Sequence, residues 1–172
     1  MGLLDDRICL VSGAGQGLGR SVALEMAAEG AGVVLLERNG ETVAAVASEI
    51  EAAGGKAYPY SLDVTDYARY EQVVGDVVIA HGRIDVLVNN AAINPPTRTL
   101  LDDTLEDWRR TITINLEAVY MGSKLVAPHM VRRQSGRIIH IASIQGFASS
   151  GECGSYNAAK GGIIAYTKSM AV

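Results

Sequence analysis

Five short apolar runs recur along the chain, and longer stretches with apolar residues at every third or fourth position separate them. Most of the runs are rich in valine, isoleucine and leucine, a pattern typical of strands that are buried on both faces. We expect these strands at residues 7–12, 32–37, 56–62, 84–89 and 137–142. The stretches with the longer period predict helices at residues 17–30, 41–53, 67–81, 105–133 and 156–172.

Local signals set several of the helix boundaries. Gly54 and Gly55 form a stop signal after the second helix, and Asp66 can cap the third helix. Residues 94–96 read Asn-Pro-Pro, which forces a loop because proline fixes φ and lacks a backbone donor. The stretch 105–133 is long, and we expect its helix in two pieces. In the first helix, the side chains expected to pack inward are Val22, Leu24, Met26 and Ala27.

The alternation of strands and helices predicts the fold class. Repeated βαβ units give a parallel sheet, and right-handed crossovers place helices on both of its faces. We therefore expect a doubly wound, Rossmann-type α/β fold with three layers, α/β/α, formed as a single domain over residues 1–172. Such a fold binds ligands beyond the carboxyl ends of its strands. Every motif described below falls at one of those ends.

Composition and charge narrow the class of protein. Hydrophobic residues make up 48% of the 172 residues, enough for a sizeable core. The net charge is −4 and the basic residues are scattered, which argues against nucleic acid or a membrane surface as a partner. The sequence shows neither a leader nor an apolar run long enough to span a bilayer, so we expect a cytoplasmic protein.

Cysteine, histidine and tryptophan add little chemistry. Cys9 and Cys153 are too few for a disulfide framework, and both are expected to be reduced. Cys9 falls in a strand and is expected in the core, whereas Cys153 is either a small loop residue, which we favour, or part of a pocket. Trp108 is expected to pack rather than to recognise a ligand. No metal site is expected, because the separations of the three histidines, His81, His129 and His140, match no metal-ligand pattern.

A glycine-rich turn follows the first strand and reads Ser-Gly-Ala-Gly-Gln-Gly-Leu-Gly over residues 12–19. Glycines allow a tight turn and let backbone N–H groups approach a pyrophosphate closely. The helix that begins near Gly17 offers free amides and the positive end of its dipole to such an anion. A strand before the turn and a helix after it favour a dinucleotide site. The residues expected at this site are Gly13, Gln16, Gly17, Leu18 and Gly19.

Glu37 closes the second strand, eighteen residues after Gly19. A dinucleotide fold places at this point the acid that accepts hydrogen bonds from the adenosine ribose. A carboxylate repels a 2′-phosphate, so we expect NAD rather than NADP as the cofactor. Arg38 could pair with that phosphate, but the neutral Gln16 leaves a second basic contact missing. The alternative for Glu37 is a solvated charge at the end of a strand.

Two further strand ends carry candidate cofactor contacts. Asp63 could accept a hydrogen bond from the adenine amino group while the Val64 backbone contacts the ring; alternatively, Asp63 caps a helix, and spacing alone does not separate the two. Asn89 and Asn90 follow the fourth strand, and their amides could tie neighbouring strands together. We favour Asn90 as part of the cofactor site over a simple turn residue.

Tyr156 and Lys160 are spaced by one helical turn, so both side chains share one face of the last predicted helix. An ammonium held beside a phenol favours the phenolate, which is a useful base. The pair alone arises often by chance on exposed helices. Its weight comes from the motifs that precede it.

Taken together, these motifs resemble those of the short-chain dehydrogenase/reductase family. They occur in the same order and at the same spacing as in that family. The residues that carry the resemblance are Gly13, Gly17, Gly19, Asp63, Val64, Asn89, Asn90, Ala91, Asn115, Ser143, Tyr156 and Lys160. The resemblance covers the whole chain. It implies an NAD(P)-dependent oxidoreductase that transfers a hydride between a nicotinamide cofactor and a secondary alcohol or ketone.

The resemblance also implies a role for each catalytic residue. Ser143 would hydrogen-bond the substrate oxygen, and Tyr156 would exchange a proton with it. Lys160 would favour the phenolate of Tyr156 and hold the nicotinamide ribose. Asn115 would hold a water that relays protons, although by position alone an asparagine inside a helix is more often a surface residue.

The chain departs from the family pattern in two places. Ala92 stands where glycine is usual, a tolerable change. Family members run roughly half as long again, whereas this chain stops at Val172 inside its last helix. We therefore expect an incomplete chain that lacks the C-terminal strands and the loop that closes over the substrate. In the family, the helices 105–133 and 156–172 often pair between subunits, which implies a homodimer or homotetramer.

The substrate is left open between sugars, polyols, 3-oxoacyl compounds and other small-molecule alcohols or ketones. Gln145 and Glu152 could hydrogen-bond a polyol. The alternative function is a truncated dinucleotide-binding module with impaired catalysis. The presence of Tyr156 argues against that module, since a pure binding protein does not need it.

Overall fold

The computed structural model describes residues 2–149 and 151–171. It divides into two compact units, and each is described by itself. The sheet unit comprises Met1–Ala91 and Met121–Ile139, and the helical unit comprises Ala92–Tyr120 and His140–Val172.

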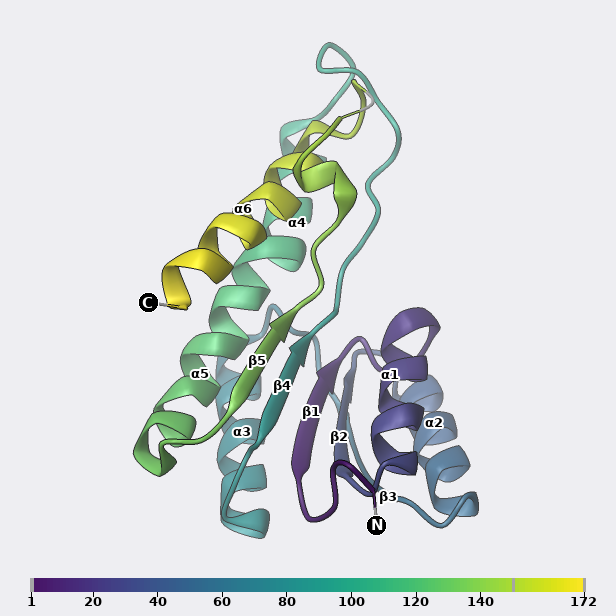
Figure 1. Ribbon diagram of the computed structural model, residues 1–172. Helices are drawn as coiled ribbons and strands as arrows, with labels where there is room; N and C mark the ends of the chain where they lie inside the picture. Colours follow the sequence, from purple (N-terminus) through teal and green to yellow (C-terminus); the bar gives the residue numbers. More distant parts are fainter. Residues whose placement is uncertain (1, 150, 172) are drawn as a thin grey trace. The chain divides into compact units, whose positions relative to one another are not determined.

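Five strands form one sheet with the order β3-β2-β1-β4-β5 (Figure 1). Parallel pairing joins β1 to both β2 and β4, and β2 to β3. In the central register, Leu10 lies between Val34 and Leu87. The strands are β1 (Ile8–Ser12), β2 (Gly32–Glu37), β3 (Lys56–Ser61), β4 (Val86–Asn89) and β5 (Arg137–His140). The five predicted strands are confirmed, with ends that shift by up to two residues.

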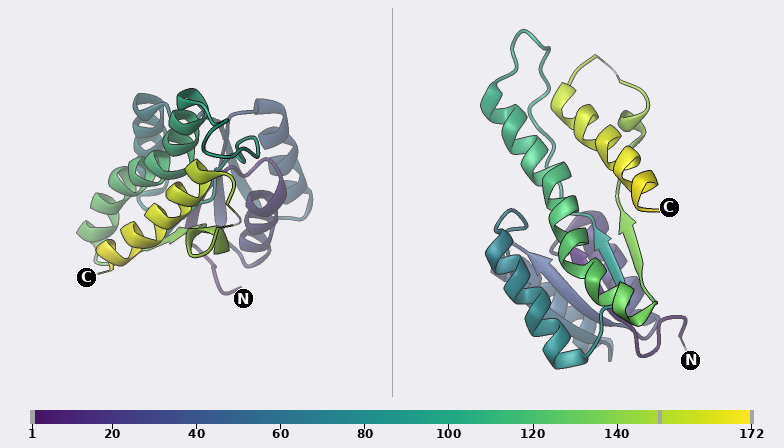
Figure 2. Two further views of the ribbon diagram at one scale, coloured as in Figure 1. Left: turned by 90° about the horizontal axis from the view of Figure 1, so that it is seen from above. Right: turned by 90° about the vertical axis from the view of Figure 1, so that its left-hand side faces the viewer.

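Helices cover both faces of this sheet, as Figures 1 and 2 show. On one face lie α1 (Gly17–Ala28) and α2 (Gly40–Ala52), and on the other lie α3 (Tyr67–His81) and the C-terminal part of α5 (Ala118–Arg133). Asp66 caps α3 through a hydrogen bond from the Arg69 amide, as predicted. The three-layer Rossmann-type fold expected from the sequence is therefore present.

The packing face of α1 differs from the prediction. Ala27 is buried as expected, but Val22, Leu24 and Met26 are only half-buried. The fully packed face consists of small residues one turn apart, which let the helix approach the sheet closely: Gly19, Ala23 and Ala27. The prediction failed because it followed side-chain size, whereas close approach requires small side chains.

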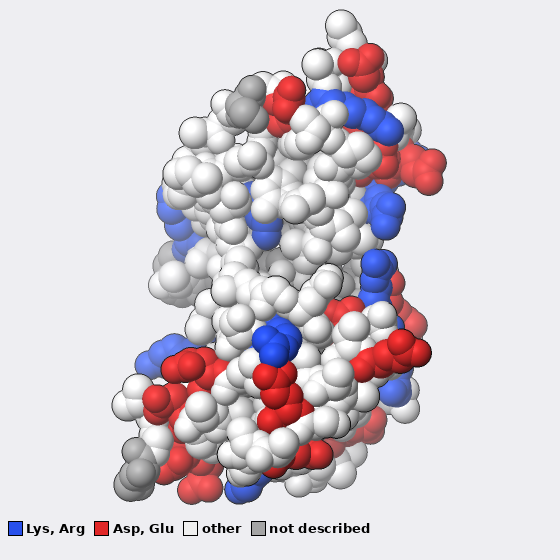
Figure 3. All heavy atoms as spheres, turned by 90° about the vertical axis from the view of Figure 1, so that its right-hand side faces the viewer, with Lys and Arg blue, Asp and Glu red and all other residues white. Residues whose placement is uncertain are grey.

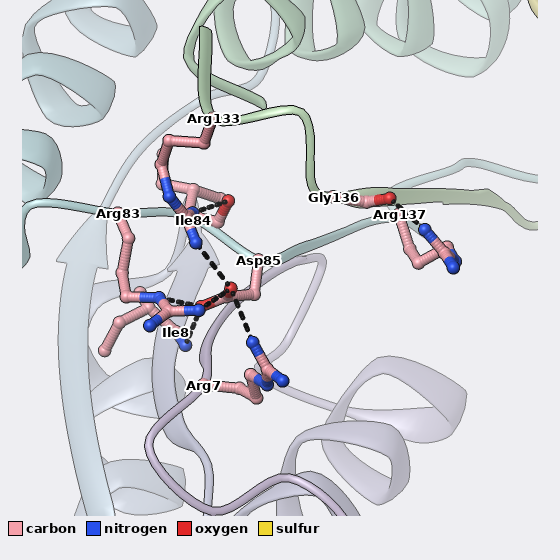
Figure 4. A network of polar contacts seen from close by, with 8 residues as sticks. All are labelled: Arg7, Ile8, Arg83, Ile84, Asp85, Arg133, Gly136 and Arg137. Carbon is pink, nitrogen blue, oxygen red and sulfur yellow. Dashed lines mark hydrogen bonds and ion pairs between the residues drawn. The ribbon is translucent and has the colours of Figure 1, made fainter. Parts of the chain in front are cut away.

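A buried carboxylate ties the amino ends of β1 and β4 to the end of α5 (Figure 4). The Asp85 side chain is 5% exposed and accepts hydrogen bonds from the Ile8 amide at 2.9 Å and from Arg83 Nε at 2.7 Å. Arg7 and Arg133 contribute longer contacts of 3.4 and 3.3 Å. Burial acts to raise the pKa of Asp85, but the hydrogen bonds from Arg83 and Ile8 outweigh it and hold the pKa below its usual value.

The helical unit contains α4 (Leu105–Ile112), the π-helical turn η1 (Thr113–Glu117), the first residues of α5, the 3₁₀ turn η2 (Ile144–Gly146) and α6 (Gly154–Met170). The predicted helix 105–133 thus has the two expected pieces, α4 and α5, joined by η1. Helix α6 begins two residues earlier than predicted, and Val172 lies outside the described residues. Within this unit, α6 packs against α4, η1 and η2 (Figure 2).

On the face shown in Figure 3, acidic and basic side chains are interspersed rather than gathered by sign. Across residues 2–149 and 151–171, no helix has the length and apolar character that a membrane span requires.

Candidate functional site

The glycine-rich turn leaves β1 at Ser12 and enters α1 at Gly17. Gly13 and Gly17 adopt φ of 65° and 54°, the left-handed region that favours glycine. No side chain caps α1, whereas Asn39 caps α2 through its side chain. The first intrahelical bond runs from the Arg20 amide to the Gln16 carbonyl at 3.2 Å, so the amides of the first turn remain available to an anion.

Close packing fixes the shape of this turn. A Cβ atom at Gly19 would lie 2.1 Å from the Gly13 carbonyl oxygen and 2.5 Å from Asn90 Nδ2. Asn90 Nδ2 donates to the carbonyl oxygens of Ser12 at 2.9 Å and Gly13 at 3.3 Å. Asn90 thus ties the end of β4 to the end of β1, as asparagine amides at this position were expected to do.

Ser12 is a residue of this site that the sequence prediction missed. Its Oγ donates to the Val88 carbonyl oxygen at 3.3 Å and accepts from the amides of Asn90 at 3.0 Å and Ala91 at 3.1 Å. These bonds satisfy the backbone where β1 and β4 separate. A small hydroxyl side chain at the last position of a strand was the available signal.

Glu37 reaches back from β2 to the glycine turn. Its Oε2 accepts from the Gly15 amide at 3.4 Å, and its Oε1 accepts from the Asn39 amide at 3.2 Å. The residue is half-buried, so the alternative of a freely solvated charge does not describe it. Gln16 and Leu18 are exposed beside the turn.

Asp63 organises the turn after β3. Its Oδ1 accepts from the Thr65 amide at 2.9 Å and from Thr65 Oγ1 at 2.7 Å. These hydrogen bonds lower the pKa of the Asp63 carboxyl, and the bond from the backbone amide has the larger effect. Since Asp66 is the residue that caps α3, the helix-capping alternative for Asp63 is wrong. Val64 is buried beside it.

The helical unit brings Tyr156 and Lys160 together on α6. Lys160 is 3% exposed, and its Nζ donates to the Ile141 carbonyl oxygen at 2.6 Å. The same Nζ lies 5.6 Å from the centroid of the Tyr156 ring. Burial lowers the pKa of Lys160, because the charged ammonium loses solvation.

A cavity of about 400 Å³ in the helical unit joins Ser143 and Tyr156. Its lining residues are Asn94, Pro95, Thr97, Ser143, Ile144, Gln145, Cys153 and Tyr156. Cys153 therefore lines a pocket. The sequence had favoured the other interpretation, a small loop residue. Its φ of 57° is left-handed, a backbone feature that the sequence pattern did not reveal.

Asn115 is fully buried in η1, contrary to the surface position that its place in a helix suggested. Its Oδ1 accepts from the Ile93 amide at 2.8 Å, and its Nδ2 donates to the Ile93 carbonyl oxygen at 2.9 Å. Asn115 lies in the π-helical turn, a wider turn of helix, and its side chain binds the backbone of the loop that follows β4. Asn115 is not among the residues that line the cavity.

Each unit therefore gathers one part of the predicted site. The sheet unit holds the glycine turn, Glu37, Asp63 and Asn90, and its free amides and carboxylate suit the phosphates and ribose of a dinucleotide. The helical unit holds Asn115, Ser143, Tyr156 and Lys160. Within the part of the chain that the structure describes, no three His, Cys, Asp or Glu side chains are grouped as metal ligands.

Comparisons with known proteins agree with this arrangement. The model of the family described as short chain dehydrogenase matches residues 7–172. The 3-oxoacyl-[acyl-carrier-protein] reductase FabG of Thermotoga maritima is 37% identical, over 98% of this chain and 68% of that protein. The meso-2,3-butanediol dehydrogenase of Serratia marcescens is 34% identical, over 98% of this chain and 65% of that protein.

Solved structures are similar over nearly the whole chain. An NAD⁺-bound xylitol dehydrogenase matches with a TM-score of 0.95 and 32% identity, over 98% of this chain and 65% of that one. A metagenomic short-chain oxidoreductase in complex with NADP matches with a TM-score of 0.93 and 34% identity, over 97% of this chain and 76% of that one. The chain thus spans about two thirds of the length of the two curated relatives.

Proposed function

The chain belongs to the short chain dehydrogenase family, and we propose that its hydride transfer between a nicotinamide cofactor and a secondary alcohol or ketone takes place at Tyr156. The observation that carries this proposal is the cavity that places Ser143 and Tyr156 in one lining, with the buried Lys160 ammonium next to the tyrosine ring. A bound nicotinamide dinucleotide supplies the hydride acceptor or donor.

Ser143 and Tyr156 act on the reacting oxygen of the substrate. Ser143 Oγ accepts a hydrogen bond from the Gln145 amide at 3.2 Å, which leaves its own proton free for the substrate oxygen. In oxidation, the Tyr156 oxygen takes the hydroxyl proton as the carbon–hydrogen bond breaks. In reduction, the Tyr156 hydroxyl returns that proton to the carbonyl oxygen.

Lys160 supports the charge that Tyr156 carries during proton transfer. Its bond to the Ile141 carbonyl oxygen uses one of three N–H donors and fixes the position of the ammonium. In a site of low dielectric, a fixed positive charge stabilises a neighbouring phenolate more than it would in water. Two N–H donors remain for a ribose hydroxyl of the cofactor.

We assign the pyrophosphate and adenosine of the cofactor to the sheet unit, and NAD as the preferred cofactor. The first-turn amides of α1, near Gly17, would hold the pyrophosphate, and Glu37 would accept from the adenosine ribose. The Gly15 amide already orients one Glu37 oxygen, and the carboxylate disfavours a 2′-phosphate. Asp63 and Val64 would contact the adenine. The similar structures include both an NAD⁺-bound and an NADP-bound protein, so this preference rests on Glu37.

The cofactor preference has a direct test. Glu37→Ser should tighten NADP binding by about tenfold, because it removes a like charge near the 2′-phosphate. The matched control is Glu41→Ser, an exposed acid in the first turn of α2. Equal NAD and NADP affinities in the unmodified protein would contradict the preference.

Tyr156→Phe tests the activity itself. Turnover of a panel of secondary alcohols should fall by at least about 10²-fold, whereas the affinity for NADH, followed by its fluorescence, should stay within about twofold. Tyr166→Phe is the control, since Tyr166 lies on α6 but does not line the cavity. A protein that binds NADH but oxidises no alcohol would instead be the binding module.

We also propose that the protein works as a dimer or tetramer. Apolar side chains on α4 and α5 are exposed, among them Leu105, Trp108 and Tyr120, with exposed fractions of 61%, 41% and 46%. Such residues are typical of helix faces that meet a second copy. Light scattering coupled to gel filtration would give the mass of the particle, and a monomer at micromolar concentration would contradict this proposal.

A further inference from the structure

We propose that the substrate carries an anionic oxygen group, a carboxylate or a phosphate, which Arg110 binds in a groove next to the cavity of Ser143 and Tyr156. This inference rests on the proposed function and adds the substrate class: a hydroxylated acid or phosphate ester rather than a neutral alcohol. The groove has a volume of about 220 Å³, and α4 contributes three residues to its lining: Asp107, Arg110 and Thr111.

The groove and the cavity are neighbours. Asn94 and Pro95 line both of them, so a ligand that passes over the loop 94–96 contacts both spaces. Together the two volumes are in the range of ordinary small-molecule sites. One molecule can thus place its reacting oxygen at Tyr156 and its other end at Arg110.

The charge of Arg110 is uncompensated. Its side chain is exposed and makes no ion pair or hydrogen bond with any residue that the structure describes. Asp107, one turn earlier on the same helix, would be its ordinary partner. The Asp107 carboxylate instead accepts from Arg98 Nη1 and from Thr104 Oγ1. Glu106 is exposed and is likewise without an ion pair to Arg110 in the described chain.

The lining of the cavity of Ser143 and Tyr156 offers an anion no cationic group comparable to Arg110. None of its lining residues is an Asp, Glu, Lys, Arg or His, and its polar groups suit hydroxyls. The Lys160 ammonium lies next to the Tyr156 ring but does not line the cavity, and it already donates to the Ile141 carbonyl oxygen. A negative group buried in the cavity would therefore lose solvation without a direct ion pair. The anionic end is therefore best placed at Arg110, whose fork of N–H donors matches carboxylate and phosphate oxygens.

Thr111 adds a second polar group to the groove. It lines the groove and is fully buried, and its hydroxyl has no hydrogen-bond partner among the described residues. A buried hydroxyl without a partner costs free energy until a ligand oxygen or a water satisfies it. The groove thus combines an unpaired cation with an unsatisfied hydroxyl, and the charge of its one carboxylate, Asp107, is paired with Arg98.

Three compounds with one carbon skeleton test the inference: D-gluconate, D-sorbitol 6-phosphate and neutral D-sorbitol. We expect a higher kcat/KM for at least one of the two anions than for sorbitol, and the anion that gains identifies the group. Arg110→Gln should lower kcat/KM for that anion by roughly three- to tenfold and leave sorbitol unchanged. Arg110→Lys should restore part of the loss, because the charge returns without the fork.

Arg109→Gln is the matched control, since Arg109 is also exposed and unpaired in the described chain but does not line the groove. It should leave all three compounds unaffected. An equal loss for sorbitol and the anions in Arg110→Gln, or sorbitol as the best of the three substrates, would overturn the inference. Turnover of neutral alcohols would then leave the proposed function intact.

A binding measurement separates the two proposals. Trp108 is the one tryptophan of the chain and lies on α4, two residues before Arg110. Its fluorescence should respond to the preferred anion but not to sorbitol, and the response should be lost in Arg110→Gln. If this holds while no alcohol is turned over, the anion site stands and the dehydrogenase activity fails. If neither anion binds, the anion site is wrong, whatever the turnover.

Discussion

The Lys160 ammonium lies 5.6 Å from the centre of the Tyr156 ring, and both side chains project from α6. The ammonium is buried and anchored to the Ile141 carbonyl oxygen, which fixes its position. The same burial that strengthens this charge also lowers the pKa of Lys160. We therefore expect the activity to depend on the protonation of Lys160.

The first prediction concerns alkaline pH. The pKa of Lys160 in the folded protein is below its ordinary value of 10.5, so the ammonium is lost before that pH is reached. We expect kcat/KM to fall on the alkaline side at a pH below 10.5. The measurement is a pH–rate profile with a saturating cofactor. A rate that is flat up to pH 10.5 would argue against a role for the ammonium.

The stability of the protein should change in the same window. Between the lowered pKa and 10.5, the unfolded chain binds more protons at Lys160 than the folded protein does. The contribution of Lys160 to the free energy of unfolding therefore rises with pH in this window. The check compares urea unfolding of the wild type and Lys160→Met at several pH values. As the pH rises, the free energy of unfolding of the wild type should increase relative to that of Lys160→Met.

Asn115 gives the second prediction. Asn115→Ala leaves the amide and the carbonyl oxygen of Ile93 without their partners, which should lower the free energy of unfolding by about 1–3 kcal/mol. Thermal unfolding measures the loss. Thr113→Ala, in the same π-helical turn, is the control, and we expect it to change stability by less than about 0.5 kcal/mol. Similar losses for both variants would show that the turn, not the Ile93 bonds, is sensitive.

The behaviour of Asn115 shows what the sequence could and could not predict. Strand and helix order followed from apolar periodicity, because that pattern sets which segments are buried on both faces. The π-helical turn around Asn115 has no comparable signal, since it inserts a wider turn without changing the local composition. The left-handed backbone at Cys153 is equally silent in the sequence. Long-range bonds such as that of Ser12 to Val88 depend on the register of the strands.

Local signals also mislead where several residues satisfy the same rule. Asp63 and Asp66 both precede α3, and either could have been its cap by spacing. The structure gives the cap to Asp66 and leaves Asp63 to Thr65. Likewise, the face of α1 that meets the sheet was assigned to larger side chains, whereas Ala23 and Gly19 occupy it.

Gly19 gives the third prediction. A Cβ at this position would overlap the Gly13 carbonyl oxygen and the Asn90 amide, so the turn must shift. Gly19→Ala should weaken cofactor binding by at least about tenfold and lower stability by about 1–3 kcal/mol. Fluorescence titration with NADH measures the first effect and urea unfolding the second.

Gly75 is the matched control for Gly19. It lies within α3, and a Cβ there would have open space around it. Gly75→Ala should stabilise the protein by about 0.5–1 kcal/mol, because alanine is the better helix former, and should leave NADH affinity unchanged. If Gly19→Ala bound NADH as the wild type does, the close contact at the turn would not matter for the cofactor.

Asp85 gives the fourth prediction. Its pKa in the folded protein is below 3.8, so its contribution to stability is present above about pH 4 and is lost as the pH falls through the lowered value. Asp85→Asn should therefore cost about 1–3 kcal/mol at pH 7 and progressively less in acid. Chemical unfolding of both proteins from pH 7 to pH 3 measures the difference.

Asp76→Asn is the control for Asp85, because Asp76 is exposed on α3. Its effect should stay within about 0.5 kcal/mol at every pH. A penalty for Asp85→Asn that did not shrink in acid would mean that packing, rather than charge, holds this end of the sheet together.

The two thiols of the chain differ in their access to reagents. Cys9 is fully buried in β1, where burial raises the pKa of its thiol to about 12, whereas Cys153 lines the cavity beside Tyr156. A maleimide dye or spin label added to the unmodified folded protein therefore has a single attachment point. That point adjoins the tyrosine, so a reporter placed there could follow substrate arrival and departure without any mutation.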